Sequence, residues 1–186
     1  FSVFVMSPDG KTMSRRLNLS SYQKIVAASN LKQRVRKMIE YYYCESLNYA
    51  DIGTPNQVEY DQGFFVKYGD GAADVKPIAH LYKTQVYQIA EYFGVPEEIT
   101  GRPPTTDTYS LPQSQDEFYF SVPYREMDLC LYGIDNQVPA EVVAEALDID
   151  KQQVERIYQN ITQKKRMAKY LHSSPEIFNN PTVQEL

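Results

Sequence analysis

The sequence predicts an α/β fold, of which this chain holds mainly helices and few strands. Apolar residues recur at helical spacing over residues 30–48, 82–93 and 124–170, whereas only residues 3–6 and 49–53 have strand character. The second of these strands leads directly into a helix start. Strand, turn and helix N-terminus in this order are typical of open α/β sheets, which bind ligands at that edge.

Length and composition exclude several classes of protein. The 186 residues suit one domain that buries enough surface to need no disulfide or metal. A net charge of −5 argues against a general nucleic-acid-binding protein. Cys44 and Cys130 are far apart, as are His80 and His172, so we expect buried free thiols and no zinc site. No signal peptide and no long apolar run are present, which predicts a cytoplasmic protein without membrane spans.

The N-terminal part is predicted to hold a strand, a loop and a long helix. The strand at 3–6 ends at the turn 8–10, and the polar, basic residues 11–20 are interpreted as a loop. The helix at 30–48 has an apolar face that we expect to be buried. The residues of this face are Leu31, Val35, Met38, Ile39 and Tyr42.

A helix start follows the predicted strand at 49–53. Thr54 is a suitable N-cap, Pro55 suits the first helical position, and Gln57 can complete a capping box. Further along, the helix at 82–93 is expected to end at Gly94. The proline-rich polar stretch at 101–123 is of a kind that is usually functional or mobile. Further helices are predicted at 124–132, 139–147 and 151–170.

Residues 64–74 form a charged, glycine-containing turn. Gly69 and Gly71 permit left-handed backbone angles and a close approach to a ligand. Lys67 and Asp74, on either side, offer opposite charges to a polar, phosphate-bearing molecule. An ordinary surface turn with solvated charges is an equally good interpretation of the spacing alone.

Four motifs together resemble one family. They are Gly-Thr-Pro-Asn-Gln-Val-Glu at 53–59, Lys-Tyr-Gly-Asp-Gly-Ala-Ala-Asp at 67–74, Leu-Tyr-Lys-Thr-Gln at 81–85 and Pro-Thr-Thr-Asp at 104–107. In this order and at this spacing, they closely resemble NAD synthetase, from about Asn30 to about Leu171. The resemblance implies a Rossmann-like adenine-nucleotide alpha-hydrolase fold, here mainly its helical C-terminal half.

The resemblance also implies an activity and a set of site residues. The family is a ligase that amidates deamido-NAD to NAD with ATP, Mg²⁺ and ammonia through an acyl adenylate, with ammonia supplied free or by a glutaminase domain. It acts as a homodimer whose deamido-NAD site lies at the subunit interface. By resemblance, the deamido-NAD contacts are Arg34, Lys67, Asp74, Lys164 and Lys165, the ATP contacts are Thr54, Lys83 and Thr105, and Glu59 is the magnesium ligand.

Two departures from the family pattern stand out. Lys164 occupies a position where the family often has histidine. The family's Ser-Gly-Gly-x-Asp-Ser loop, which cradles pyrophosphate, has no counterpart, because the chain contains no Gly-Gly pair. We therefore interpret residues 1–186 as the C-terminal part of a single NAD synthetase domain, inactive in isolation.

Plainer roles and other functions compete with this interpretation. Thr54 can simply cap a helix, Glu59 and Lys83 can be solvated, and lysines near the end of a helix complement its dipole. The whole chain can instead be a non-catalytic structural or dimerisation fragment. A helix-turn-helix at 138–161 is a further alternative, which the acidic chain and its weakly basic second helix argue against.

Overall fold

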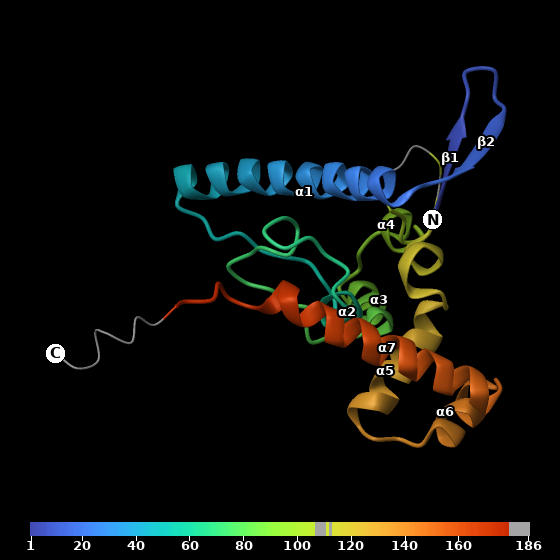
Figure 1. Cartoon of the computed structure of the whole chain (residues 1–186). Coiled ribbons are helices and arrows are strands. Elements are labelled where there is room, and N and C mark those ends of the chain that lie inside the picture. Colours follow the sequence, from blue (N-terminus) through green and yellow to red (C-terminus); the bar gives the residue numbers. More distant parts are fainter. Residues whose placement is uncertain (107–110, 112, 179–186) are drawn as a thin grey trace.

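The computed structural model describes residues 1–106, 111 and 113–178. A hairpin of β1 (Ser2–Met6) and β2 (Thr12–Arg16) projects from one end of the long helix α1 (Leu19–Leu47), as Figure 1 shows. The strands are antiparallel, and Ser2 pairs with Arg16. This two-stranded sheet is the one sheet within the described ranges, so the prediction of few strands is confirmed.

The prediction of a loop at 11–20 is wrong, because this stretch contains β2 and the first two residues of α1. The side chain of Asn18 caps α1 by accepting a hydrogen bond from the backbone N–H of Ser21 at 2.8 Å. The helix ends at Asn48, which adopts a left-handed conformation with φ of 55°. With neither glycine nor proline between residues 19 and 47, nothing interrupts the helix at residue 30.

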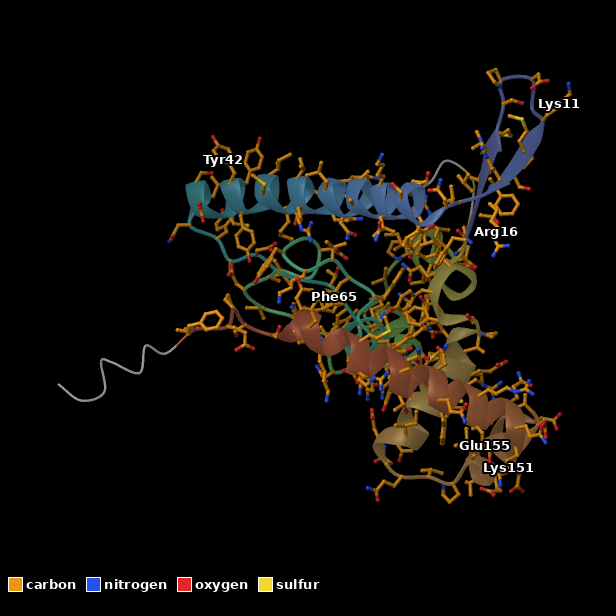
Figure 2. The ribbon with its side chains drawn as sticks, viewed as in Figure 1. Lys11, Arg16, Tyr42, Phe65, Lys151 and Glu155 are labelled. Atoms are coloured by element: carbon orange, nitrogen blue, oxygen red, sulfur yellow. The ribbon has the colours of Figure 1, made fainter. Side chains whose placement is uncertain are left out.

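The apolar face of α1 is exposed, in contrast to the prediction. Its five predicted core residues are between 46% and 70% exposed, and Tyr42 points away from the rest of the molecule (Figure 2). The buried residue of this helix is Lys37. Periodicity therefore identified an apolar face correctly, but the described part of the chain places nothing over it.

The predicted strand at 49–53 is reduced to a single parallel bridge between Ile52 and Val75. The following helix, α2 (Gln57–Gln62), is capped by Asn56 rather than by Thr54. The Asn56 side chain accepts from the N–H of Glu59, and the Glu59 carboxylate accepts from the N–H of Asn56, both at 3.1 Å. The capping box thus exists two residues later than predicted, because buried Asn56 satisfies the helix start better than exposed Thr54.

The C-terminal helices form the hydrophobic core and lie close to their predicted positions. Buried side chains from α2, α5, α6 and α7 meet there, including Val58, Leu131, Val143 and Ile161. The helices that follow α2 are α3 (Lys83–Tyr92), α4 (Glu97–Thr100), the π-helix η1 (Asp116–Phe120), α5 (Tyr124–Asp135), α6 (Ala140–Leu147) and α7 (Lys151–His172).

The end of α3, the two cysteines and the proline-rich stretch were also subjects of prediction. Gly94 ends α3 with φ of 68°, as predicted, and the preceding Phe93 is 75% exposed. Cys130 is buried as expected, Cys44 is partly exposed, and both are free thiols. Part of the proline-rich stretch, residues 107–110 and 112, lies outside the described residues. Across the ranges that the structure describes, no helix has the length and apolar character that crossing a membrane requires.

Candidate functional site

The starts of α2 and α3 lie side by side and bring two predicted site residues together. The backbone N–H of Gln57 donates to the carbonyl of Leu81 at 2.8 Å, which links the two helix starts. The Lys83 ammonium lies 3.5 Å from the Glu59 carboxylate, and their side chains are only 17% and 13% exposed. Lys83 also lies over the ring of Tyr124, 5.3 Å from its centroid. A carboxylate and an ammonium that are shielded from water at two helix starts can bind a charged ligand, such as a phosphate together with its metal cation.

Asp128 of α5 supports this arrangement from behind. Its carboxylate accepts from the backbone N–H groups of Lys83 at 3.3 Å and Thr84 at 2.7 Å, so it caps α3. Burial raises the pKa of the Asp128 carboxyl above its ordinary value, against the effect of these hydrogen bonds. Sequence reasoning missed Asp128 because it is distant in sequence from α3. The available signal was that Tyr82, the residue before α3, is not one of the usual N-cap residues.

Arg34 and Lys67 meet where the 64–74 turn passes between α1 and the end of α7 (Figure 1). The Arg34 guanidinium donates to the carbonyl of Lys67 at 3.2 Å. The Lys67 ammonium donates to the carbonyls of Tyr170 at 2.8 Å and Ser173 at 2.7 Å. In this geometry, Lys67 satisfies carbonyls at the C-terminus of α7, where a cation is favoured.

Asp74 belongs to a second network under α1. Its carboxylate accepts from the backbone N–H of Asp51 at 2.8 Å, and the buried Asp51 carboxylate binds the Lys37 ammonium at 2.7 Å. Burial alone lowers the pKa of Lys37, but hydrogen bonds to Asp51 and Glu40 outweigh it and raise that pKa. This ion pair ties the Ile52–Val75 bridge to α1, and no local sequence pattern predicted it.

Lys164 and Lys165 are neighbours in sequence but point to different partners. The Lys164 ammonium donates to the carbonyl of Tyr119 at 2.6 Å, and burial lowers the pKa of Lys164 to about 8. Lys165 forms ion pairs with Asp135 at 2.6 Å and Asp61 at 3.2 Å. The structure therefore does not bring these two lysines to a common point.

Comparison with models of known protein families identifies the family of this chain. The model of the family described as NAD synthase matches residues 4–170. The chain belongs to the NAD synthase family. Its relatives include the NH(3)-dependent NAD(+) synthetases of Rhizobium meliloti and Mesorhizobium japonicum, each 57% identical, over 95% and 92% of this chain and 53% and 54% of their own lengths. The chain spans about half the length of the curated relatives it matches.

Solved structures support the same fold. An NMN synthetase from Francisella tularensis aligns with a TM-score of 0.63 and 25% identity, over 87% of this chain and 61% of that protein. An NH3-dependent NAD synthetase from Campylobacter jejuni aligns with a TM-score of 0.60 and 21% identity, over 83% and 56%. The predicted Rossmann-like α/β class, here with few strands, is confirmed.

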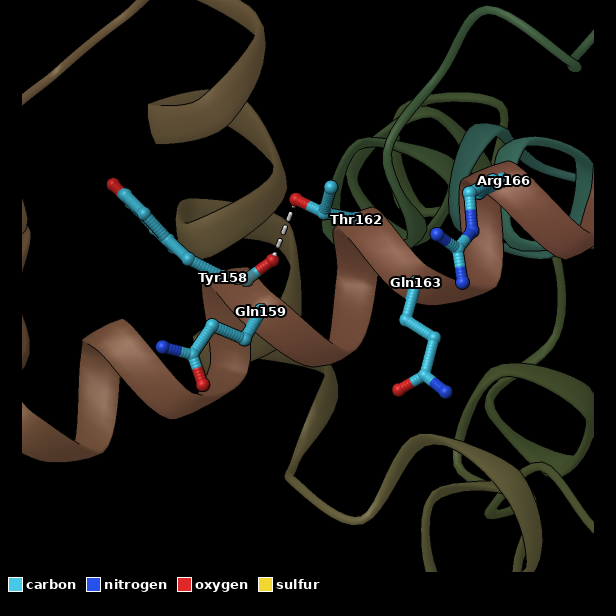
Figure 3. A pocket seen from close by; sticks show the side chains of 5 residues that line it. All are labelled: Tyr158, Gln159, Thr162, Gln163 and Arg166. Atoms are coloured by element: carbon cyan, nitrogen blue, oxygen red, sulfur yellow. Dashed lines mark hydrogen bonds between the residues drawn. The ribbon is translucent and has the colours of Figure 1, made fainter.

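Two predicted ATP contacts of this NAD synthase chain have little protein around them. Thr54 is exposed on the loop before α2, and Thr105 is exposed in a bridge with Ser114. A hollow of about 440 Å³ on α7, between Tyr158 and Arg166, contains none of the predicted residues (Figure 3). A second hollow of about 470 Å³ includes Lys164 in its lining.

Glu59 is the predicted metal ligand, and its surroundings allow a limited test of that role. One carboxylate oxygen accepts from the N–H of Asn56 and the other faces Lys83. No cluster of three or more histidine, cysteine or acidic side chains that could hold a metal occurs in the described ranges. Mg²⁺ is often held by one or two carboxylates together with substrate phosphates and water. Glu59 therefore fits a Mg²⁺ whose other ligands come from a nucleotide.

Proposed function

We propose that this chain is the C-terminal part of an NAD synthetase domain that amidates deamido-NAD to NAD with ATP and ammonia. The names of the relatives, at 57% identity, support the activity and favour ammonia over a glutaminase domain as the nitrogen source. The single structural observation that carries the proposal is the shielded Glu59–Lys83 pair at two adjoining helix starts. Such a pair suits the phosphates of ATP together with Mg²⁺.

The chemistry requires activation of a carboxylate. A carboxylate oxygen of deamido-NAD attacks the α-phosphorus of ATP, and pyrophosphate leaves, giving an acyl adenylate. Ammonia then adds to the acyl carbon, AMP leaves with the bonding electrons, and the nitrogen loses a proton to give the amide. Mg²⁺, when bound, supplies positive charge to the phosphates, and the protein supplies positioning and further charge neutralisation.

The residues divide this work between two regions. Glu59 would hold Mg²⁺, while Lys83 contacts a phosphate of ATP as a point charge, and Thr54 and Thr105 supply further ATP contacts. Arg34 of α1, together with Lys67 and Asp74 of the 64–74 turn, binds deamido-NAD. In the structure, Lys165 forms ion pairs with two aspartates, and Lys164 donates to a backbone carbonyl. To contact the substrate, each lysine must give up these partners.

A homodimer forms part of the same proposal. The apolar face of α1, which includes Tyr42, is exposed, and so is the neighbouring Tyr43; aromatic side chains of this kind are enriched in interface cores. A second copy packed on this face covers it. Arg34, on the same helix, then lies next to a deamido-NAD molecule that the partner helps to hold.

Formation of NAD from deamido-NAD, ATP and ammonium tests the proposal. The full-length protein should turn over at an ordinary enzyme rate, on the order of 1 per second. The 186-residue chain alone should not, since it spans about half the length of its relatives. A full-length protein that forms no NAD would leave the non-catalytic fragment as the better interpretation, and turnover by the chain alone would show that it contains a complete site.

A further inference from the structure

Lys76 is a half-buried cation that none of the roles above uses. It follows the Ile52–Val75 bridge directly, and its stem lies against Gly53, where an added Cβ would come within 3.2 Å of its Cγ. Its ammonium lies over the ring of Tyr60, 4.9 Å from the centroid. Burial, and then the nearby charge of Lys37, lower the pKa of Lys76. Across residues 1–106, 111 and 113–178, Lys76 has no carboxylate within 4.0 Å.

The surroundings of Lys76 combine cations with aromatic rings. The Tyr60 ring also meets the ring of His172 at 4.5 Å, and the ring nitrogen of His172 lies 3.0 Å from the Tyr60 carbonyl. These contacts place Tyr60 against the C-terminal end of α7, which is also where the Lys67 ammonium binds the carbonyls of Tyr170 and Ser173. Lys67, like Lys76, forms no ion pair with a carboxylate in the part of the chain that the structure describes. Two cations that lack acidic partners therefore approach the same end of α7.

A half-buried ammonium without a counter-ion costs free energy, because it has lost hydration that one aromatic ring only partly replaces. Most surface lysines avoid this cost by extending into water. Lys76 is instead held back by its packing on Gly53 and Tyr60. Its stem lies against Gly53, the residue before the proposed ATP contact Thr54, and Lys76 follows the proposed deamido-NAD contact Asp74 by two residues in sequence. A phosphate group would supply the negative charge that this position lacks.

We propose that Lys76 binds a phosphate group of one of the two nucleotides, as a further binding residue of the site. The proposal rests on the proposed function. Phosphate is the shared chemistry of ATP and deamido-NAD, and lysine recognises it as a point charge. Gly53 is required at its position, because a side chain there would displace the stem of Lys76 and come within 2.8 Å of Ala73.

Steady-state kinetics of Lys76→Met in the full-length protein test this role. The KM for one nucleotide, measured with the other saturating, should rise about tenfold, as expected for the loss of one charge-assisted hydrogen bond. The kcat should stay near that of the wild type, and Lys76→Arg should restore the KM. Lys24→Met is the matched control, because Lys24 is exposed on α1 and its change should leave both KM values unaltered.

The results of these measurements distinguish ATP from deamido-NAD as the source of the phosphate. They also distinguish failure of the role of Lys76 from failure of the proposed function. A higher KM for deamido-NAD assigns the phosphate to the dinucleotide, and a higher KM for ATP assigns it to the triphosphate. Two unchanged KM values in a folded, active variant overturn the role of Lys76. A wild type that forms no NAD overturns the proposed function instead. In that case, titration with inorganic pyrophosphate decides the role of Lys76, because equal binding by wild type and Lys76→Met rejects it and tenfold weaker binding by the variant supports it.

Discussion

The carboxylate of Glu59 and the ammonium of Lys83 lie 3.5 Å apart, at the starts of two helices that a backbone hydrogen bond holds together. Each side chain compensates the charge of the other while both are shielded from water. The second carboxylate oxygen of Glu59 is fixed by the N–H of Asn56, and the backbone of Lys83 is fixed by Asp128. The pair is therefore held in place by the fold before any ligand arrives.

Glu59→Gln in the full-length protein should lower the rate of NAD formation by at least about tenfold, because Mg²⁺ loses a charged ligand. The fold should remain intact, since glutamine can still accept from the N–H of Asn56 in the capping box. Raising the Mg²⁺ concentration should restore part of the rate. Initial rates over a range of Mg²⁺ concentrations measure this effect.

Two further variants isolate the magnesium role from the capping role. Both variants remove the negative charge that faces Lys83, and Glu59→Ala also removes the acceptor for Asn56, so Glu59→Ala should lower the melting temperature further than Glu59→Gln does. Glu97→Gln, at the exposed start of α4, should leave the rate unchanged. If Glu59→Gln has the wild-type rate at limiting Mg²⁺, then the roles of Glu59 are limited to capping α2 and pairing with Lys83.

The full-length protein should form a twofold dimer through the apolar face of α1, burying more than about 2,000 Å² in total, as obligate pairs do. Met38→Lys should weaken this dimer, because Met38 is 70% exposed on that face and a buried lysine has no partner there. The helical content should not change. Light scattering at low micromolar concentration measures the mass of both proteins.

Tyr92→Lys on α3 is the control for this substitution. Tyr92 is 84% exposed but lies on a different helix, so the dimer should survive the change. A monomer mass for the wild type would contradict both the dimer and the deamido-NAD site shared between its subunits. A dimer that Met38→Lys leaves intact would place the interface elsewhere.

The fold was predictable from sequence where local signals decide the structure. The helices of the 124–170 region were found because their apolar faces pack on one another within the chain, and Gly94 was found because a left-handed helix end favours glycine. Helix α1 was only partly predictable, since periodicity reveals an apolar face but not what covers it. Its true start, at Leu19 after the cap Asn18, was hidden by the polar residues of its first turns.

The candidate site was predictable to a smaller extent, because many of its contacts join distant residues. The resemblance suggested Glu59 and Lys83, which the structure brings together, but it gave no sign of Asp128 behind them. The Lys37–Asp51 ion pair likewise depends on how the chain returns under α1. A short motif reports which residue types are present, whereas hydrogen bonds across such separations depend on the whole fold.

Lys164 should make the stability of the protein depend on pH in an unusual direction. Burial lowers its pKa from 10.5 to about 8 in the folded protein, so between these values the unfolded state binds more protons than the folded state. Stability therefore rises with pH in that window. Relative to Lys164→Met, the free energy of unfolding of the wild type should increase between pH 7 and pH 10 by about 1 kcal/mol, a value reduced because the side chain is only partly buried.

Urea unfolding of both proteins at pH 7 and pH 10 measures this difference, and Lys165→Met is the control. Burial alone lowers the pKa of Lys165, but hydrogen bonds and ion pairs with Asp135 and Asp61 outweigh it and raise that pKa, so Lys165 remains mostly charged in both states at these pH values. Its replacement should change stability by a similar amount at pH 7 and pH 10. If the wild type and Lys164→Met also differ equally at the two pH values, then the Lys164 ammonium is hydrated in solution. Its contact with the Tyr119 carbonyl then does not bury the charge.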